Sequence, residues 1–464
     1  MTTMKKLLLM NILAWLTFPF ALPINAKEFT DGFISYTILS LDDNTVSATW
    51  TKHSPEDVII IPAKVNYSGR TFDVTEVRLI NDIPIYQLII SNGISKIVQY
   101  DKTVLPYLKR LDLPGSLKTI ENNLFCYCPA LEEVNLGEGI ETLQNYCFMS
   151  SHIRRLHIPS SVKNIWGGFC CIDKLEEITV HPDNAYYHSY GNTLMEKQGR
   201  KVILGNNTFT IPDNAKSIEG NAYCMFSLGM YNTGHVNQKP IDIIIPQSVS
   251  RINNNAFFID SIATLRIPQS TGLSSNSFWF KSVKEIITED GESPLNSFPE
   301  TKTTSLLYFD APTDDKVVDH VYLGRDIKNG DKLFDGYSYQ RFTIKNLTLG
   351  PNVTNFTEEG HRYNIGSISS LITEPEKVTV RMDIDYYTNT PLYVPVGTKE
   401  RYMSAEGWKN FITIIEKEKQ PTAITHTTES ATNEPTYYTI DGKRMTKVPK
   451  KGIYIKNHKK YAVK

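Results

Sequence analysis

Four pairs of like-charged residues recur at nearly constant spacing in the first half of the chain. Basic and acidic pairs alternate every 22 or 23 residues: Lys109-Arg110, Glu132-Glu133, Arg154-Arg155 and Glu176-Glu177. If these pairs stand on neighbouring strands, which lie about 4.8 Å apart, each basic pair faces an acidic one. Opposite charges that face each other across strands contribute roughly 0.2–1 kcal/mol per contact, whereas like charges repel.

This alternation has two interpretations. It sets the strand register and keeps the surface soluble, or it forms a stripe that contacts a ligand. Because the charges cancel, such a stripe suits a polar or mixed ligand better than a polyanion. The candidate ligand-binding residues at exposed strand positions are Arg110, Glu133, Arg155, His157 and Glu177.

The other chemically capable residues form no recognised catalytic or metal-binding motif. The chain has no G-x-S-x-G elbow, Walker loop, H-E-x-x-H pair or dinucleotide-binding glycine pattern, and its ten histidines are scattered. Asp383 and Asp385 occupy alternate positions of an expected strand, an arrangement of little specificity. We therefore predict no catalytic residues, no metal and no cofactor.

The six cysteines lie within a window of about a hundred residues, and their spacing matches no zinc-binding pattern. Either they pair in an exported protein, or they are buried thiols that act as small hydrophobic side chains. We favour the second interpretation, because several cysteines occupy equivalent positions of a repeat. They are Cys126, Cys128, Cys147, Cys170, Cys171 and Cys224.

A repeat of 22 or 23 residues positions the charged pairs. Successive copies begin at Leu108 (LKRLDLPGSLKTIENNLF), Leu131 (LEEVNLGEGIETLQNYCF) and Ile153 (IRRLHIPSSVKNIWGGF), and a fourth opens at Leu175. Degenerate copies extend upstream and downstream. One copy cannot bury its apolar residues alone, so consecutive copies must stack. The inward residues Leu111, Val134, Leu156 and Ile178 should then form one buried column.

Within each copy, a short apolar strand is ended by Pro or Gly and is followed by apolar residues that pack beneath it. We therefore expect a leucine-rich-repeat solenoid with a parallel β-sheet on one face and short helices, turns and loops on the other. A small β module follows at the C-terminus. Residues 295–345 lose the repeat period, although YFDAP and VYLGRD resemble strands of degenerate repeats.

Breaks in the pattern divide the chain into regions. Lys5 and Lys6 precede an apolar stretch from Leu7 to Phe20, and Ala26 is a small residue suitable for cleavage. This is the layout of a secretory signal peptide, and the apolar stretch is too short to span a bilayer. The expected regions are a signal peptide at 1–26, an N-terminal cap with early degenerate repeats at 27–107, the repeat solenoid at 108–418 with a hairpin insertion at 181–207 and an end cap at 391–416, a linker at 419–436 and a small β module at 437–464.

The repeat form apolar-x-I-P-x-S-V-x-x-I-x-x-x-A/C-F resembles that of the BspA-like leucine-rich-repeat family of bacterial secreted and surface proteins. IPSSVKNIWGGF from Ile158 and IPQSVSRINNNAF from Ile245 carry the resemblance. LYVPVGTKERYMSAEGWKNF is similar to the closing segment of such domains, and IDGKRMTKVPKKGIYIKN resembles a C-terminal β sorting-type module. The resemblance implies a curved surface protein. Some members of the family are adhesins, but the family shares no binding or catalytic residues.

The formal net charge of −1 offers no general attraction for nucleic acid. We expect an extracytoplasmic binding or adhesion protein, secreted or held at the bacterial cell surface or outer envelope. Its partner would be an extracellular protein or glycan, and no membrane span would remain after signal cleavage. Two alternatives stay open: an envelope-associated glycan-degrading enzyme with a site in 295–345, and a purely structural envelope protein. The oligomeric state and the ligand stay open as well.

Overall fold

A computed structural model of the chain separates two compact units, Met1–Glu416 and Lys417–Lys464. The signal peptide predicted at 1–26, the linker predicted at 419–436 and Cys170 lie outside the described residues. The structure describes residues 28–51, 58–80, 84–99, 104–167, 169, 171–172, 174–205, 209–224, 239–296, 305–309, 316–327, 332–336, 342–360, 363–418, 437–438, 444–445, 452–456 and 459–463.

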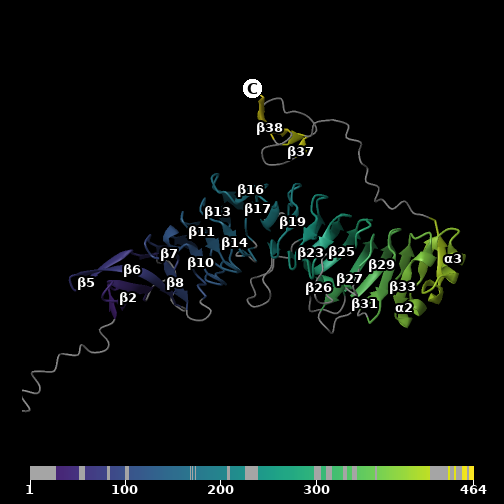
Figure 1. Ribbon diagram of the computed structural model, residues 1–464, viewed down its shortest axis with the longest axis horizontal. Coiled ribbons are helices and arrows are strands. Elements are labelled where there is room, and N and C mark those ends of the chain that lie inside the picture. Colours follow the sequence, from purple (N-terminus) through teal and green to yellow (C-terminus); the bar gives the residue numbers. More distant parts are fainter. Residues whose placement is uncertain are drawn as a thin grey trace, which may run out of the picture. The chain divides into compact units, whose positions relative to one another are not determined.

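Six parallel strands form the first sheet of the solenoid, in the order β4-β7-β9-β11-β13-β15 (Figure 1). Leu111 pairs with Val134, Val134 with Leu156, and Leu156 with Ile178, and all four side chains are buried. The predicted buried column is confirmed. The strands are β4 (Val58–Ile61), β7 (Gln87–Ile90), β9 (Arg110–Leu113), β11 (Glu133–Leu136), β13 (Arg155–Ile158) and β15 (Glu177–Val180).

The other side of these repeats carries turns, as expected, together with two-residue strands in place of the expected short helices. These strands are parallel, and a single 3-10 turn, η1 (Gly115–Leu117), accompanies them in these repeats. Residues such as Lys118 (φ 58°) and Asn123 (φ 59°) adopt the left-handed conformation, which stops a right-handed helix within a turn. The two-residue strands are β10 (Thr119–Ile120), β12 (Thr142–Leu143) and β14 (Asn164–Ile165).

An aromatic column packs beneath the same repeats. The ring centroids of Phe125 and Phe148 lie 6.0 Å apart and those of Phe148 and Phe169 lie 5.7 Å apart, both pairs being stacked. All three side chains are buried. Each repeat therefore contributes one ring to a core that continues from one turn of the solenoid to the next.

A hairpin interrupts the repeats in the segment where an insertion is expected. β16 (Tyr187–Tyr190) and β17 (Thr193–Glu196) are antiparallel, as are β17 and β18 (Lys201–Leu204), after which β18 resumes parallel pairing with β19 (Ser217–Ile218). The sheet continues through β22 (Arg251–Ile252) to β24 (Gly272–Leu273).

The hairpin lies between two hydrophobic core clusters. Leu194 and Leu204 face each other and belong to the cluster of the first repeats. Met195 and Val202, also opposite each other, belong to the cluster that runs on to Ile414. Val202 and Leu204 are two residues apart and share the buried face of β18, and the register shifts between Leu194 and Met195, so the hairpin contributes to both clusters along its length. We call Leu194, Met195, Val202 and Leu204 the seam.

A twelve-stranded sheet follows and includes the region that loses its period in the sequence. The described strands between residues 295 and 345 pair in parallel with their neighbours, so the solenoid continues through this region. The strands expected in YFDAP and VYLGRD are confirmed as β26 and β27. The sheet contains β20 (Tyr223–Cys224), β21 (Ile241–Ile244), β23 (Phe257–Ile267), β25 (Phe278–Thr288), β26 (Ser305–Phe309), β27 (Lys316–Leu323), β28 (Lys332–Gly336), β29 (Phe342–Leu349), β31 (Tyr363–Ile365), β32 (Ile368–Ser370), β34 (Leu392–Pro395) and β35 (Ile414–Lys417).

Both ends of the first unit are covered by additional elements. A mixed sheet at the N-terminal end has Tyr36 and Trp50 in its core. At the other end, α3 (Lys399–Ser404) and η3 (Trp408–Asn410) place Tyr402 and Trp408 in the core. The N-terminal sheet consists of β1 (Glu28–Thr30), β2 (Ile34–Ser40), β3 (Thr45–Trp50), β5 (Lys64–Tyr67), β6 (Arg70–Leu79) and β8 (Lys96–Gln99).

The prediction of a strand that contains Asp383 and Asp385 is wrong. β33 (Thr379–Met382), which pairs with β30 (Asn355–Glu358), ends before Asp383, and α2 (Ile384–Asn389) follows. Tyr386 and Tyr387 are consecutive and both buried, whereas the predicted strand has one buried face and would bury only every second residue.

The second unit contains a four-stranded antiparallel sheet in the order β37-β36-β38-β39. Its strands are β36 (Tyr437–Tyr438), β37 (Arg444–Met445), β38 (Gly452–Lys456) and β39 (Lys459–Val463). None of the helices in the described residues combines the length and hydrophobicity needed to cross a bilayer.

Candidate ligand-binding surface

All five candidate residues lie on the outward face of the first parallel sheet, which we call the ladder face. Arg110 pairs in register with Glu133, Glu133 with Arg155, and Arg155 with Glu177. Their Cα partners alternate in charge because the repeat places each pair at the same position of consecutive strands. The expected alignment is therefore present, while its role in ligand binding stays a prediction.

The charged side chains of this row stay accessible to solvent. Arg110 Nη1 lies 3.5 Å from Glu133 Oε2, and Arg155 Nε lies 3.6 Å from Glu177 Oε2. The exposed fraction of these side chains ranges from 44% for Arg110 to 76% for Arg155. Long, exposed ion pairs contribute little to stability, so these charges can exchange one partner for another at small cost.

A second charged row runs beside the first. Arg154 Nη1 donates a hydrogen bond of 2.7 Å to Glu176 Oε1. Nearer the N-terminal end, Lys109 Nζ lies 5.5 Å from the centroid of the Tyr86 ring. The backbone N–H of Glu132 donates to Lys109 O, and that of Arg154 donates to Glu132 O, so this row follows consecutive turns of the solenoid.

A third row of polar side chains was missed by the sequence analysis, apart from His157. Asp112 accepts a hydrogen bond of 2.7 Å from Gln87 Nε2 and another from Asn135 Nδ2, and Arg110 Nε lies 3.4 Å from it. The signal was present in the sequence. LDL, VNL, LHI and ITV all place a polar residue between two inward apolar positions of one strand.

His157 stands in this third row, on the exposed position predicted for it. Its Nδ1 lies 2.9 Å from Thr179 Oγ1, and its ring centroid lies 6.4 Å from that of His181 in an edge-on arrangement. No group of three His, Cys, Asp or Glu side chains within the described residues could hold a metal ion. In this setting His157 can offer a hydrogen bond or an aromatic contact to a ligand.

The ladder face changes character toward its N-terminal end. Val58 and Ile60 on β4 and Tyr86 before β7 are large hydrophobic side chains that stay exposed. The sequence run VIIIPAKV contains this signal, because only every second residue of such a strand can point into the core. The ladder face therefore joins an apolar and aromatic end to a charged middle.

In the described part of residues 295–345, polar side chains make contacts between turns of the solenoid. Asp319 Oδ1 accepts a hydrogen bond of 2.7 Å from Lys345 Nζ, while Asp326 accepts bonds from Thr354 and from the backbone N–H of Asn355. His320 uses Nδ1 toward Glu285 and Nε2 toward Thr348, both at 3.0 Å. Each of these three residues is thus engaged in a contact between turns of the solenoid.

Residues 81–193 and 204–306 match the family model of the BspA type leucine rich repeat region, in six copies. These two segments are BspA-type leucine-rich repeats. The two matched segments leave out residues 194–203, which carry most of β17, the turn after it and most of β18. The hairpin is therefore an interruption of the BspA-type repeats.

Three solved structures are similar to this chain. They are a leucine-rich cell surface protein of Faecalibacterium prausnitzii A2-165 (16% identity, 71% of this chain and 90% of that one, TM-score 0.35), a leucine-rich repeat protein of Bacteroides ovatus ATCC 8483 (15%, 84% and 100%, 0.40) and the pneumococcal vaccine antigen PcpA (14%, 84% and 98%, 0.40). No curated protein matches the chain.

Proposed function

We propose that this chain is an extracytoplasmic binding or adhesion protein that uses the ladder face to hold an extracellular protein or glycan. The observation that carries the proposal is the alignment of exposed Arg110, Glu133, Arg155 and Glu177 on consecutive parallel strands. The secretory layout of residues 1–26 supports a location outside the cytoplasm, in the medium or at the cell envelope.

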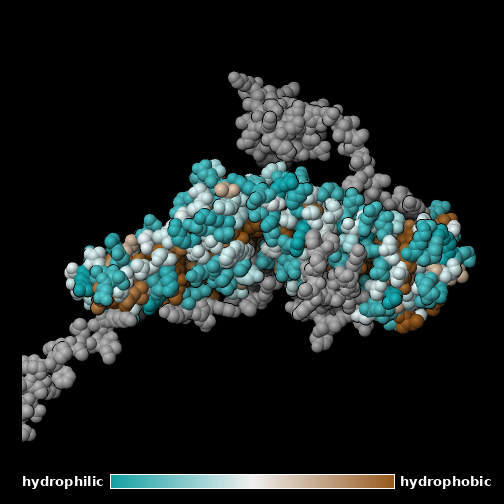
Figure 2. All heavy atoms as spheres, in the orientation of Figure 1, coloured by the Kyte–Doolittle hydropathy of each residue, from teal (hydrophilic) through white to brown (hydrophobic). Residues whose placement is uncertain are grey.

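The chemistry of the ladder face defines the kind of ligand. The basic and acidic residues of the ladder face alternate and nearly cancel in net charge. They favour a ligand surface that carries both positive and negative groups, since each ligand charge finds an opposite partner within one strand spacing. The apolar end at Val58, Ile60 and Tyr86 adds area that loses water on binding. Figure 2 shows mainly hydrophilic and neutral residues over the visible face of the first unit, so a polar ligand suits that face as well.

Arg155→Glu tests the proposal, because Arg155 has the most exposed side chain of the row and its reversal creates like charges beside Glu133 and Glu177. Wild-type protein is first screened against arrays of extracellular proteins and glycans. We expect Arg155→Glu to weaken binding of the ligand so found by about tenfold or more in a titration.

Arg251→Glu is the matched control. Arg251 is an exposed arginine on β22, in a sheet other than the ladder face, and the substitution changes the net charge by the same amount. Equal affinities of the wild type and of Arg155→Glu for a ligand would exclude the ladder face. A full screen without a ligand would favour a purely structural envelope protein.

A further inference from the structure

Cys171 and Cys224 meet in the interior although 53 residues separate them in the sequence. Their sulfur atoms lie 3.0 Å apart in hydrogen-bond contact, and the two residues are 5% and 2% exposed. They form a small buried cluster with Phe258, against which the partly buried Met149 and Trp279 pack. Two sulfur atoms at this separation are closer than ordinary van der Waals contact allows.

The two cysteines lie on either side of the hairpin in the chain. Cys171 comes before β15, the last strand of the first parallel sheet, and Cys224 is on β20, at the start of the twelve-stranded sheet. The chain between them contains the whole hairpin of β16, β17 and β18. A bond between the two sulfurs would join the repeats on either side of the seam.

We infer that Cys171 and Cys224 form a disulfide that fastens the two halves of the solenoid across the seam. A disulfide bond has a length of about 2.05 Å, so the sulfurs need to approach by roughly 1 Å. Closing a loop of this length restricts the unfolded chain and stabilises the folded one. The inference rests on the proposed location outside the cytoplasm for its natural oxidant, but the pairing itself is independent of the ligand.

The reaction is thiol–disulfide exchange with a low-molecular-weight or protein disulfide as oxidant. The thiolate of one cysteine attacks the donor disulfide, forms a mixed disulfide and releases one donor thiol. The thiolate of the second cysteine then attacks the protein sulfur of that mixed disulfide and expels the second donor thiol. The two cysteine protons end on the donor thiols, so the protein is oxidised by two electrons and the donor is reduced. Because both residues are buried, exchange takes place while the chain folds.

Refolding of the full chain from urea in a buffer of oxidised and reduced glutathione provides the test. The remaining thiols are alkylated in denaturant and the chain is digested with trypsin without reduction. Trypsin releases Cys171 in residues 164–174 and Cys224 in residues 217–251, because Lys239 precedes a proline. We expect these two peptides to be linked, and to separate on reduction. Cys126, Cys128 and Cys147 share residues 119–154 and serve as an internal reference.

Alanine variants distinguish Cys171 from its neighbour Cys170. Cys170→Ala should keep the linked peptides, whereas Cys171→Ala and Cys224→Ala should lose them. The oxidised wild type should melt at least about 3 °C above the reduced protein, and Cys224→Ala should show no such rise.

Two results would overturn the inference. One is recovery of Cys171 and Cys224 as alkylated thiols or as glutathione adducts from refolded wild-type protein. The other is persistence of the link in Cys171→Ala, which would assign it to Cys170. Neither result would bear on ligand binding by the ladder face, which Arg155→Glu tests separately.

Discussion

Two serines at the same position of the repeat each connect their own turn of the solenoid to the turn before it. Ser116 Oγ donates to Ile94 O at 2.6 Å and accepts from the Gly93 N–H at 3.0 Å. Ser161 makes the same two contacts with Ile140 O at 2.7 Å and the Gly139 N–H at 2.8 Å. A single hydroxyl thus satisfies a donor and an acceptor of the neighbouring turn.

Ser161→Ala should therefore lower the free energy of unfolding by about 1–3 kcal/mol, because it leaves the Gly139 N–H and the Ile140 carbonyl without this partner. Urea unfolding followed by circular dichroism measures the effect. Ser160→Ala is the control, since the adjacent Ser160 hydroxyl bonds only the exposed carboxylate of Glu138. A loss for Ser160→Ala as large as that for Ser161→Ala would contradict the assignment.

The sequence could predict part of this residue-level arrangement. Equal spacing of Arg110, Glu133, Arg155 and Glu177 determines their alignment once the repeats stack in register. The contact between Cys171 and Cys224 could not be predicted in the same way. These two cysteines are separated by an insertion, so repeat spacing does not relate their positions.

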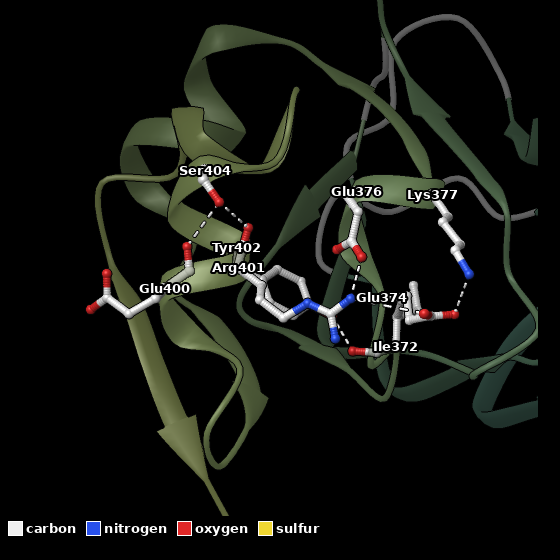
Figure 3. A network of polar contacts seen from close by, with 8 residues as sticks. All are labelled: Ile372, Glu374, Glu376, Lys377, Glu400, Arg401, Tyr402 and Ser404. Carbon is white, nitrogen blue, oxygen red and sulfur yellow. Dashed lines mark hydrogen bonds and ion pairs between the residues drawn. The ribbon is translucent and has the colours of Figure 1, made fainter.

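Among the elements, the end cap combines a buried tyrosine with exposed ion pairs. Figure 3 shows Arg401 beside Glu374 and Glu376, and Tyr402 on the same helix α3. Arg401 bonds Glu376 at an exposed site. The Tyr402 hydroxyl is buried, donates to Ile372 O at 2.7 Å and lies 2.6 Å from Ser370 Oγ. Burial raises the pKa of Tyr402 above its ordinary value, so the phenol stays protonated and keeps its donor.

Tyr402→Phe should lower the free energy of unfolding by about 1–3 kcal/mol, because the buried Ile372 carbonyl loses its phenol donor and Ser370 Oγ loses one of its contacts, while the ring stays in place. Arg401→Ala, which removes the exposed ion pair one residue away, should have the smaller effect. Chemical denaturation of both variants compares them directly. The opposite order would mean that the ion pairs around Arg401 hold the cap.

The elements also show where sequence patterns stop being sufficient. Strands that alternate apolar and polar residues were predicted well, because one buried face determines their register. The sequence pattern did not predict α2, because this helix is short. The alternation of buried and exposed residues in the preceding β33, up to Met382, indicated a strand instead. The short helices expected within the first repeats are replaced by two-residue strands, for which a window of two residues holds no periodicity.

At the scale of the whole first unit, the hydrophobic core is divided mainly into two large clusters, which meet at the hairpin. Stability of a stacked repeat protein is a sum of repeat terms and nearest-neighbour terms, so a weak interface can uncouple the two sides. We expect that interface at the seam, where the BspA-type repeats are interrupted and a hairpin of different topology takes their place.

Met195→Ala combined with Val202→Ala should divide thermal unfolding into two transitions. Both side chains are fully buried and belong to the second cluster, while their neighbours Leu194 and Leu204 stay with the first. Truncating Met195 alone removes about 2–5 kcal/mol of packing, and at the seam this loss falls on the coupling between the halves. Scanning calorimetry should resolve the two halves as separate peaks. The buffer contains a reductant, so that a disulfide between Cys171 and Cys224 does not contribute.

Leu265→Ala provides the comparison, because Leu265 is fully buried in the middle of the second cluster, where β23 pairs with both β21 and β25. Its loss of packing is similar to that of Met195→Ala alone, but it falls within one half, so the melting temperature should decrease without a new transition. If the seam variant and Leu265→Ala melt with the same number of peaks, the hairpin does not limit cooperativity. Two peaks for the seam variant alone would locate the weakest interface of the solenoid at the point that the Cys171–Cys224 bond spans.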